Sequence, residues 1–596
     1  MTADYLELGN VLTRLVRVSD PELWPRQGFS PTQHATPTTT YEPWGAPERG
    51  IEQLLAAAAG LGSLHGADGA PPTERPTRAG GGDRVALVHL RGTPQTCVVG
   101  LAGLATTELT IQAALRQAGS NVAQIKSSDA ADLEAQLIDV RARPLDLLVF
   151  TGPVVSTARR LVSGGGPAPR VLDSLQALYN GPVGEDAELA EVLSAVTNLQ
   201  VLAPIRIDTQ TLDPEPTERA LAQATDKVLA ADAELGILHN AGFAVHTFAR
   251  AFTAAAESLA AWRRRLPTPE GPHAVGGLAL IDLGGRFTEI AVVAESRASR
   301  SVDDLAQRDL MIGDAPAAGR SGPAATPPPH ALLVSDIGRW LPFDWSPTGL
   351  GDHLANYLRR PFVLPATWAQ LLIAMALGRQ RLSRTCAGFR MASGTANWSG
   401  DWRRHVAAYV ISGGYVRHLP GPAFALALAI DGIEPMGVSE IWCDRWGLSP
   451  YLAVSGRKAE PDPALYLRRL ATVVAPVALR LDWRRPHEDD IMALVTVERQ
   501  GGQATSFRIV PGSLMRFPLR PGEEAVLTVH PQREHDFGAG PGKAWRGRVT
   551  GGDLGLIFDT RGRPIAMPPE DLIRQAKLRE WLNTLGTGVR WEDGSA

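Results

Sequence analysis

One short motif occurs twice in this chain with the same internal spacing, and it limits the folds that the chain can adopt. The first copy is Glu7–Arg14 (ELGNVLTR), and the second is Asp282–Glu289 (DLGGRFTE), 275 residues further on. In both copies an acidic residue, a glycine and a threonine stand at offsets zero, two and six. Each copy lies where an apolar run breaks and then resumes, a pattern that predicts strand, tight turn and strand.

The residue types in this motif suit the binding of a phosphate group. A glycine turn exposes bare backbone N–H groups, and a threonine hydroxyl beside it can donate to the same phosphate. An acid at the strand end, Glu7 or Asp282, can hold a metal-bound water. Two such turns facing each other would form a phosphate clamp. We therefore expect the turns around Gly9 and Gly284 to approach each other across a shared cleft.

A second pair of segments predicts that the repeat extends further along the chain. Leu147–Gly152 and Tyr409–Gly414 are short β-rich runs that end in a hydroxyl residue and glycine. Each run precedes a predicted helix, at 155–162 and at 423–430. Internal repetition on this scale is typical of two similar domains. The alternation of strands and helices between the motifs favours an α/β fold with helices on both faces of a sheet.

The composition is that of an ordinary globular protein. The chain has 596 residues, of which 44% are hydrophobic and 20% charged, and its net charge is −4. This charge gives no electrostatic reason to expect nucleic acid or an anionic membrane as a partner. We find no leader peptide and no apolar stretch long enough to span a membrane, and we therefore expect a cytoplasmic protein. Cys97, Cys386 and Cys443 are far apart and predict buried thiols.

The repeated segments resemble the superfamily of actin, the Hsp70 ATPase and the sugar and acetate kinases, in which two related α/β domains close on ATP. Within that superfamily the chain is most similar to the glutamate mutase L family, accessory proteins of coenzyme B12-dependent carbon-skeleton mutases. The segments that carry the similarity are the two glycine turns, Ala35–Thr40, Glu234–Asn240, Ile411–Gly414 and Gly551–Pro564.

The resemblance implies duplicated actin-like (ribonuclease H-like) α/β domains that form a two-lobed cleft. We expect the first lobe at 1–270, with a Gly- and Pro-rich insertion at about 63–83, and the second at 271–475, with a similar insertion at about 313–329. Short strand-like runs separated by turn signals predict a β-sandwich or barrel at 476–568. A terminal helix and tail follow at 569–596. We interpret this mostly-β module as a docking or oligomerisation domain.

The resemblance also implies ATP and Mg²⁺ as cofactors. Asp282 and Glu7 would be the catalytic residues and would hold Mg²⁺ through water. In that superfamily the glycine turns grip the phosphates, and a Gly-Gly pair after a strand abuts the adenosine. The corresponding nucleotide-binding residues here are Gly9, Asn10, Thr13, Arg14, Gly284, Gly285, Thr288, Ser412, Gly413 and Gly414.

The chain departs from the family pattern at both turns. The first turn of the family begins with Asp and ends in Thr-Lys, whereas this chain has Glu7 and Thr13-Arg14. The second turn ends in Thr288-Glu289, where the family more often has Thr-Asp. Glutamate reaches one methylene further than aspartate, and arginine is not a compact ammonium. These departures favour ATP binding over hydrolysis, so that we expect at most a weak ATPase.

Three functions remain open at this point. The first is an ATP-binding reactivator or chaperone of a partner enzyme, by resemblance a B12-dependent mutase. The second is a nucleotide-independent assembly protein with a degenerate clamp. The third is a small-molecule kinase on the same fold, which would need a general base that no motif identifies.

Overall fold

The computed structural model describes residues 2–8, 13–19, 35–40, 84–89 and 95–591. Gaps in the last range fall at 102, 118–121, 127–129, 142–144, 164–170, 182–183, 195–196, 198, 206–211, 267–275, 295–297, 305–309, 312–331, 361–362, 390–399, 456–461, 484–489, 503 and 533–534. The chain divides into two compact units, which we describe separately. The first comprises Met1–Ala255, Met391–Asn397 and Leu448–Leu465, and the second comprises Ala256–Arg390, Trp398–Gly447 and Tyr466–Ala596.

The first unit contains a five-stranded mixed sheet with the order β3-β2-β1-β4-β10. Its strands are β1 (Thr2–Leu8), β2 (Thr13–Ser19), β3 (Ala35–Thr40), β4 (Arg84–Val88) and β10 (Ala244–Thr247). β1, β2 and β3 are antiparallel, and β4 runs parallel to both β1 and β10. The helices α9 (Ala233–Asn240), α10 (Phe248–Arg265) and α16 (Ser449–Val454) follow or contact these strands. β4 is buried almost throughout, as expected of a strand with neighbours on both sides.

The first unit also contains a separate sheet in which every strand is parallel to its neighbours, with the order β6-β5-β7-β8-β9. Its strands are β5 (Thr96–Gly100), β6 (Val122–Lys126), β7 (Leu145–Phe150), β8 (Val171–Tyr179) and β9 (Leu199–Val201). Read along the chain this order is 2-1-3-4-5, that of a doubly wound α/β fold.

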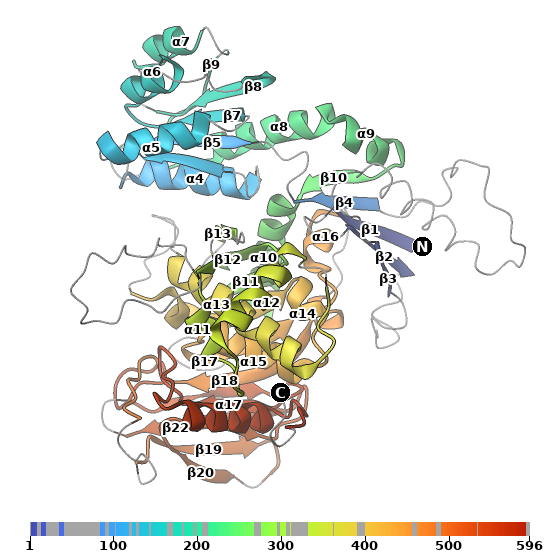
Figure 1. Cartoon of the computed structure of the whole chain (residues 1–596), viewed down its shortest axis with the longest axis vertical. Coiled ribbons are helices and arrows are strands. Elements are labelled where there is room, and N and C mark those ends of the chain that lie inside the picture. The colour runs from blue at the N-terminus through green and yellow to red at the C-terminus, as the bar shows by residue number, and fades with distance from the viewer. Residues whose placement is uncertain are drawn as a thin grey trace, which may run out of the picture. The chain divides into compact units, whose positions relative to one another are not determined.

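Helices cover both faces of the parallel sheet (Figure 1). On one face, α4 (Ala105–Gln117) and α8 (Glu215–Ala231) share a core with Val98 and Val149. On the other, α5 (Ala130–Arg141), α6 (Val155–Ser163) and α7 (Asp186–Leu193) pack with Val99 and Phe150. Burial on both faces explains why these strands are nearly continuous apolar runs rather than alternating ones.

The second unit is built around an eight-stranded sheet with the order β13-β12-β11-β16-β17-β18-β24-β21. Its strands are β11 (Gly277–Leu283), β12 (Phe287–Val293), β13 (Ala298–Asp304), β16 (Val406–Ser412), β17 (Gly437–Cys443), β18 (Arg468–Ala475), β21 (Leu514–Phe517) and β24 (Leu556–Asp559). β11, β12 and β13 are antiparallel, whereas β16 runs parallel to β11 and β17 parallel to β16. These five strands repeat the order and directions of the mixed sheet in the first unit.

The two hairpins that flank the repeated motif also share one register. Glu7 pairs with Arg14 and Leu8 with Thr13 in the first. Asp282 pairs with Glu289 and Leu283 with Thr288 in the second. The predicted strands on both sides of each turn, and the α/β class, are therefore confirmed.

The second pair of segments, however, does not extend the repeat, and that prediction was wrong. The run that contains Leu147–Phe150 is β7, which belongs to the all-parallel sheet of the first unit. The strand that occupies the position of β16 in the first unit is β4, because β4 runs parallel to β1 as β16 runs parallel to β11. Strands that are buried on both faces of a sheet have similar apolar sequences. The hydroxyl residue and glycine at the end of β7 were therefore not enough to distinguish β7 from β4.

Two long helices of the second unit, α13 (Trp368–Gly388) and α15 (Pro422–Ile433), pack against each other. The Thr367 hydroxyl accepts a hydrogen bond from the backbone N–H of Gln370 and caps α13, and Pro422 stands at the start of α15. Shorter elements of this unit are β14 (Leu310–Met311), β15 (Leu332–Leu333), α11 (Val334–Gly338), α12 (Pro347–Arg359), the 3₁₀ turn Trp402–His405 and α14 (Gly414–Arg417). A second 3₁₀ turn, Pro463–Leu465, lies in the first unit.

The C-terminal strands divide between two sheets. β20 (Thr505–Ile509), β19 (Ala493–Arg499), β22 (Glu524–Pro531) and β23 (Trp545–Thr550) form an antiparallel sheet in that order. β21 and β24, which we expected in the same module, instead extend the eight-stranded sheet and share a core with the smaller one. The helix α17 (Asp571–Leu585) confirms the predicted terminal helix (Figure 1).

Two further sequence predictions can be compared with the described part of the chain. All three cysteines are buried and free, as expected. Among the helices that the structure describes, none is both long and apolar enough to cross a membrane.

Candidate functional site

The candidate site of the second unit lies where two parallel strands end side by side. Asp282 near the end of β11 pairs directly with Ser412 at the end of β16. Both side chains are buried, with 7% and 3% of their surface exposed. The carboxyl ends of neighbouring parallel strands are where ligands bind in open α/β sheets. Two residues separated by 130 positions in the sequence, both predicted for the site, are thus brought together.

The two glycines after β16 differ sharply in what surrounds them. Gly413 has a φ of +104°, and a Cβ there would lie 2.4 Å from the carbonyl oxygen of Leu283. Its backbone therefore packs directly against the strand that carries Asp282. At Gly414 a Cβ would meet nothing within 4 Å. Gly413 is thus required by packing, whereas Gly414 leaves bare backbone beside open space.

The turn that follows Asp282 is a tight hairpin, and a buried arginine forms hydrogen bonds with its carbonyl groups. The Gly284 N–H donates to the Phe287 carbonyl at 2.9 Å and closes the turn. Arg381, whose side chain is fully buried on α13, donates to the carbonyl oxygens of Gly284 (2.7 Å), Gly285 (3.3 Å) and Arg286 (2.9 Å). Its guanidinium also lies over the Tyr415 ring, 5.5 Å from the ring centre. The sequence analysis missed this residue, and the signal was weak because α13 carries two further arginines, Arg379 and Arg384.

Thr288 lies in this hairpin too, but its hydroxyl faces the protein interior. The side chain is fully buried, and no described residue forms a hydrogen bond with its Oγ1. The next residue, Glu289, forms a buried ion pair with Arg300 at 2.6 Å. The side chains of Thr288 and Glu289 are therefore buried in the interior of the unit. The backbone of the turn, rather than these side chains, is the part that could contact a ligand.

The first turn can be placed only by its backbone. Glu7 lies in β1, and Thr13 and Arg14 open β2, in the register given above. Gly9 and Asn10 lie outside the described residues. Because the two turns belong to different compact units, their approach across a shared cleft stays a prediction.

The described residues indicate which groups could contact a magnesium nucleotide if one binds here. No group of three His, Cys, Asp or Glu side chains that could hold a metal ion occurs among them. A magnesium ion would therefore keep most of its water shell, which is usual for Mg²⁺ bound with a nucleotide phosphate, with Asp282 as its contact. The open space beside Gly414 would allow a ligand group, by the resemblance the adenosine, to lie against the backbone.

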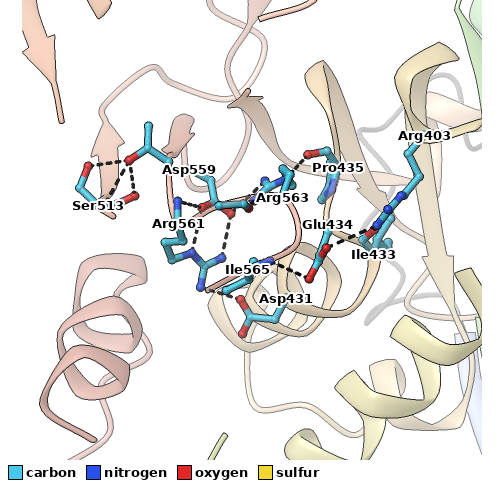
Figure 2. A network of polar contacts seen from close by, with 12 residues as sticks. Arg403, Asp431, Ile433, Glu434, Pro435, Ser513, Asp559, Arg561, Arg563 and Ile565 are labelled. Atoms are coloured by element: carbon cyan, nitrogen blue, oxygen red, sulfur yellow. Dashed lines mark hydrogen bonds and ion pairs between the residues drawn. The ribbon is translucent and has the colours of Figure 1, made fainter. Parts of the chain in front are cut away.

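A buried network of opposite charges lies elsewhere in the second unit, and Figure 2 shows the part of it formed by Asp431, Asp559, Arg561 and Arg563. Asp431 on α15 pairs with Arg379 of α13 at 2.7 Å and with Arg561 at 2.8 Å. Arg561 and Arg563 both pair with Asp559 at the end of β24, at 2.8 and 3.2 Å. These side chains are almost fully buried.

The electrostatics of Asp559 follow from its surroundings. Burial alone would raise the pKa of this carboxyl, but the guanidinium groups of Arg561 and Arg563 outweigh burial and hold its pKa well below the usual range. Asp559 is therefore a stable anion in the folded protein. The run Gly551–Pro564, which contributed to the family resemblance, supplies three of the charges in this network.

Comparisons with known proteins give no family. No protein-family model matches the sequence, and no curated protein matches it. Among solved structures, the chain is similar to acetone carboxylase in a nucleotide-free structure, with 11% identity, a TM-score of 0.28, and coverage of 86% of this chain and 81% of that chain. It is also similar to an ATP-dependent caprolactamase from Pseudomonas jessenii, with 12% identity, a TM-score of 0.28, and coverage of 85% and 81%. At these TM-scores the similarities carry no argument about family, ligand or activity.

Proposed function

We propose that this chain is an ATP-binding protein built on two actin-like, ribonuclease H-like cores. The observation that carries the proposal is the edge formed by Asp282, the Gly284–Phe287 turn and Ser412–Gly414. It places a carboxylate, a glycine turn and bare backbone at the carboxyl ends of adjacent parallel strands. The equal strand order and hairpin register in the two units support a duplicated core.

Each part of this edge has a role in the proposal. The backbone N–H groups of the turn donate to the nucleotide phosphates, as oriented amides do in other anion sites. Asp282 contacts the water shell of Mg²⁺, and Gly414 lets the adenosine approach the backbone. By the resemblance, Glu7 would hold Mg²⁺ through water, as Asp282 does.

The biological role that we propose rests on the family resemblance. ATP binding would draw the two lobes together and change the surface offered to a partner enzyme, as hinge closure does elsewhere. By resemblance that partner is a B12-dependent mutase, for which this chain acts as a reactivator or chaperone. Recovery of a mutase subunit with the tagged chain, dependent on ATP, would support this role.

One observation favours a second candidate, a nucleotide-independent assembly protein. The Thr288 hydroxyl, expected to contact phosphate, is buried in the hairpin core. A chain that had lost nucleotide binding could keep this hairpin for shape alone. Such a protein would form the same oligomer with and without ATP in size-exclusion chromatography.

Thermal unfolding tests the ATP proposal. A ligand that binds only the folded state stabilises it by about 2.7 kcal/mol when its concentration is 100 times its Kd. We therefore expect magnesium ATP to raise the Tm of the wild-type chain, and Asp282→Ala to abolish most of this rise. Asp352→Ala, which removes an exposed carboxylate on α12 of the same unit, is the matched control and should respond like wild type. No rise for the wild-type chain would contradict ATP binding.

A further inference from the structure

A fully buried arginine, Arg381, contacts the Gly284–Phe287 turn and has no carboxylate partner among the described residues. Two other arginines of α13 have carboxylate partners: Arg379 with Asp431 at 2.7 Å and Arg384 with Asp303 at 2.6 Å. Arg381 lies between these two arginines in the sequence, and its side chain is fully buried. No described carboxylate pairs with it. Burial of an unpaired charge is costly, so such a residue is expected only where something else requires it.

The partners of Arg381 are instead three successive carbonyl oxygens. They belong to Gly284, Gly285 and Arg286, at 2.7, 3.3 and 2.9 Å from the guanidinium nitrogens. In a planar trans peptide the N–H points away from the preceding C=O. When three successive carbonyls face Arg381, the next three N–H groups face away from it. Successive N–H groups on one side of a turn form a concave site for an anion.

The surroundings fix this arrangement further. The Gly284 N–H is already bonded to the Phe287 carbonyl, which closes the turn. Tyr415, whose ring lies under the guanidinium, follows directly after Gly413-Gly414. The same arginine thus contacts the turn and the residue that follows Gly413-Gly414.

We infer that Arg381 is a positioning residue for nucleotide phosphate: it holds the Gly284–Arg286 carbonyls so that the amide N–H groups of the turn face the phosphate. Its buried charge also favours an anion on the opposite side of the turn, where the distance is short and the intervening medium is protein rather than water. This inference rests on the proposed ATP site. Lysine at this position keeps the charge but not the planar fork that reaches three acceptors.

The test compares the affinities of ATP and of adenosine by calorimetric titration, because only ATP carries phosphate. The variants are Arg381→Gln, Arg381→Lys and, as a control on the same helix, Arg384→Gln. We expect Arg381→Gln to weaken ATP binding at least about tenfold, equivalent to about 1.4 kcal/mol, while adenosine binding stays within about twofold. Arg381→Lys should fall between Arg381→Gln and wild type, and Arg384→Gln should bind ATP as wild type does.

The outcomes separate this inference from the proposed function. If the wild-type chain binds no ATP, the proposed function fails and Arg381 positions nothing. If the wild type binds ATP and Arg381→Gln binds it equally well, or loses ATP and adenosine to the same extent, only the role of Arg381 is overturned. If Arg381→Gln does not fold, Arg381→Lys decides: unchanged ATP affinity overturns the inference, and a loss confined to ATP supports it.

Discussion

At the residue scale, Gly413 and Gly414 show that adjacent identical residues can be required for different reasons. Gly413 has a positive φ and almost touches the Leu283 backbone, so that no other residue fits there without strain. Gly414 is free of such contacts, and its small size matters only if a ligand occupies the space beside it. The sequence predicted that both glycines belong to the site, but it could not assign these separate roles.

Substitution by alanine should separate the two glycines. We expect Gly413→Ala to lower the free energy of unfolding by about 1–3 kcal/mol or more, because a non-glycine residue is strained at this φ and the new Cβ meets the Leu283 carbonyl. Gly414→Ala should change it by less than about 0.5 kcal/mol, as substitutions without such features do. Urea unfolding of both variants measures the difference. Equal effects would show that Gly413 does not pack as described.

At the scale of elements, the segment after β24 is held by its charges. Asp559 pairs with both Arg561 and Arg563, and Arg561 also pairs with Asp431 on α15 and lies over the Trp581 ring of α17 at 4.9 Å. The sequence showed the run of charged residues and glycines but not its partners, because these come from helices that are distant in the chain. Pairing of this kind is fixed by tertiary packing rather than by local pattern.

Asp559→Asn should strongly destabilise the second unit. Removing one partner of a buried ion pair leaves uncompensated charge and costs about 3–5 kcal/mol. Asp571→Asn is the matched control: its ion pair with Arg574 is 71% exposed on the aspartate side, and an exposed pair contributes about 0–1 kcal/mol. Urea unfolding at neutral pH compares the two variants. A loss for Asp559→Asn no larger than that for Asp571→Asn would contradict the network.

The same carboxyl predicts a pH dependence. Its pKa is lower in the folded protein than in the unfolded chain, where an aspartate has a pKa of about 3.9. The resulting stabilisation is complete above that value and is lost as the pH falls toward the folded pKa. In urea unfolding between neutral pH and pH 3, the free energy of unfolding should therefore fall more steeply with decreasing pH for wild type than for Asp559→Asn. Parallel curves would mean that Asp559 does not titrate with a depressed pKa.

At the scale of the whole molecule, the sequence predicted the repeated hairpins better than the sheets that contain them. The hairpins depend on a local signal, glycine between two apolar runs, and their shared register follows from equal spacing. The all-parallel sheet was not separated from the first lobe, because periodicity identifies a buried strand but not its neighbours. For this reason the prediction that Leu147–Gly152 is the repeat of Tyr409–Gly414 was wrong. The contacts of Arg381 could not be predicted from the sequence either, because its carbonyl partners lie more than 90 positions away in the chain.

The central claim is that ATP binds at the edge formed by Asp282, the Gly284–Phe287 turn and Ser412–Gly414. Titration calorimetry of magnesium ATP against wild type and Gly414→Val tests it most directly, because a Cβ at Gly414 would meet nothing within 4 Å and a side chain there would enter the space proposed for the nucleotide. We predict saturable binding to wild type and a loss of at least about tenfold in affinity for Gly414→Val, with an unchanged Tm in the absence of nucleotide. Equal affinity of the two proteins, or no binding to wild type, would contradict the claim.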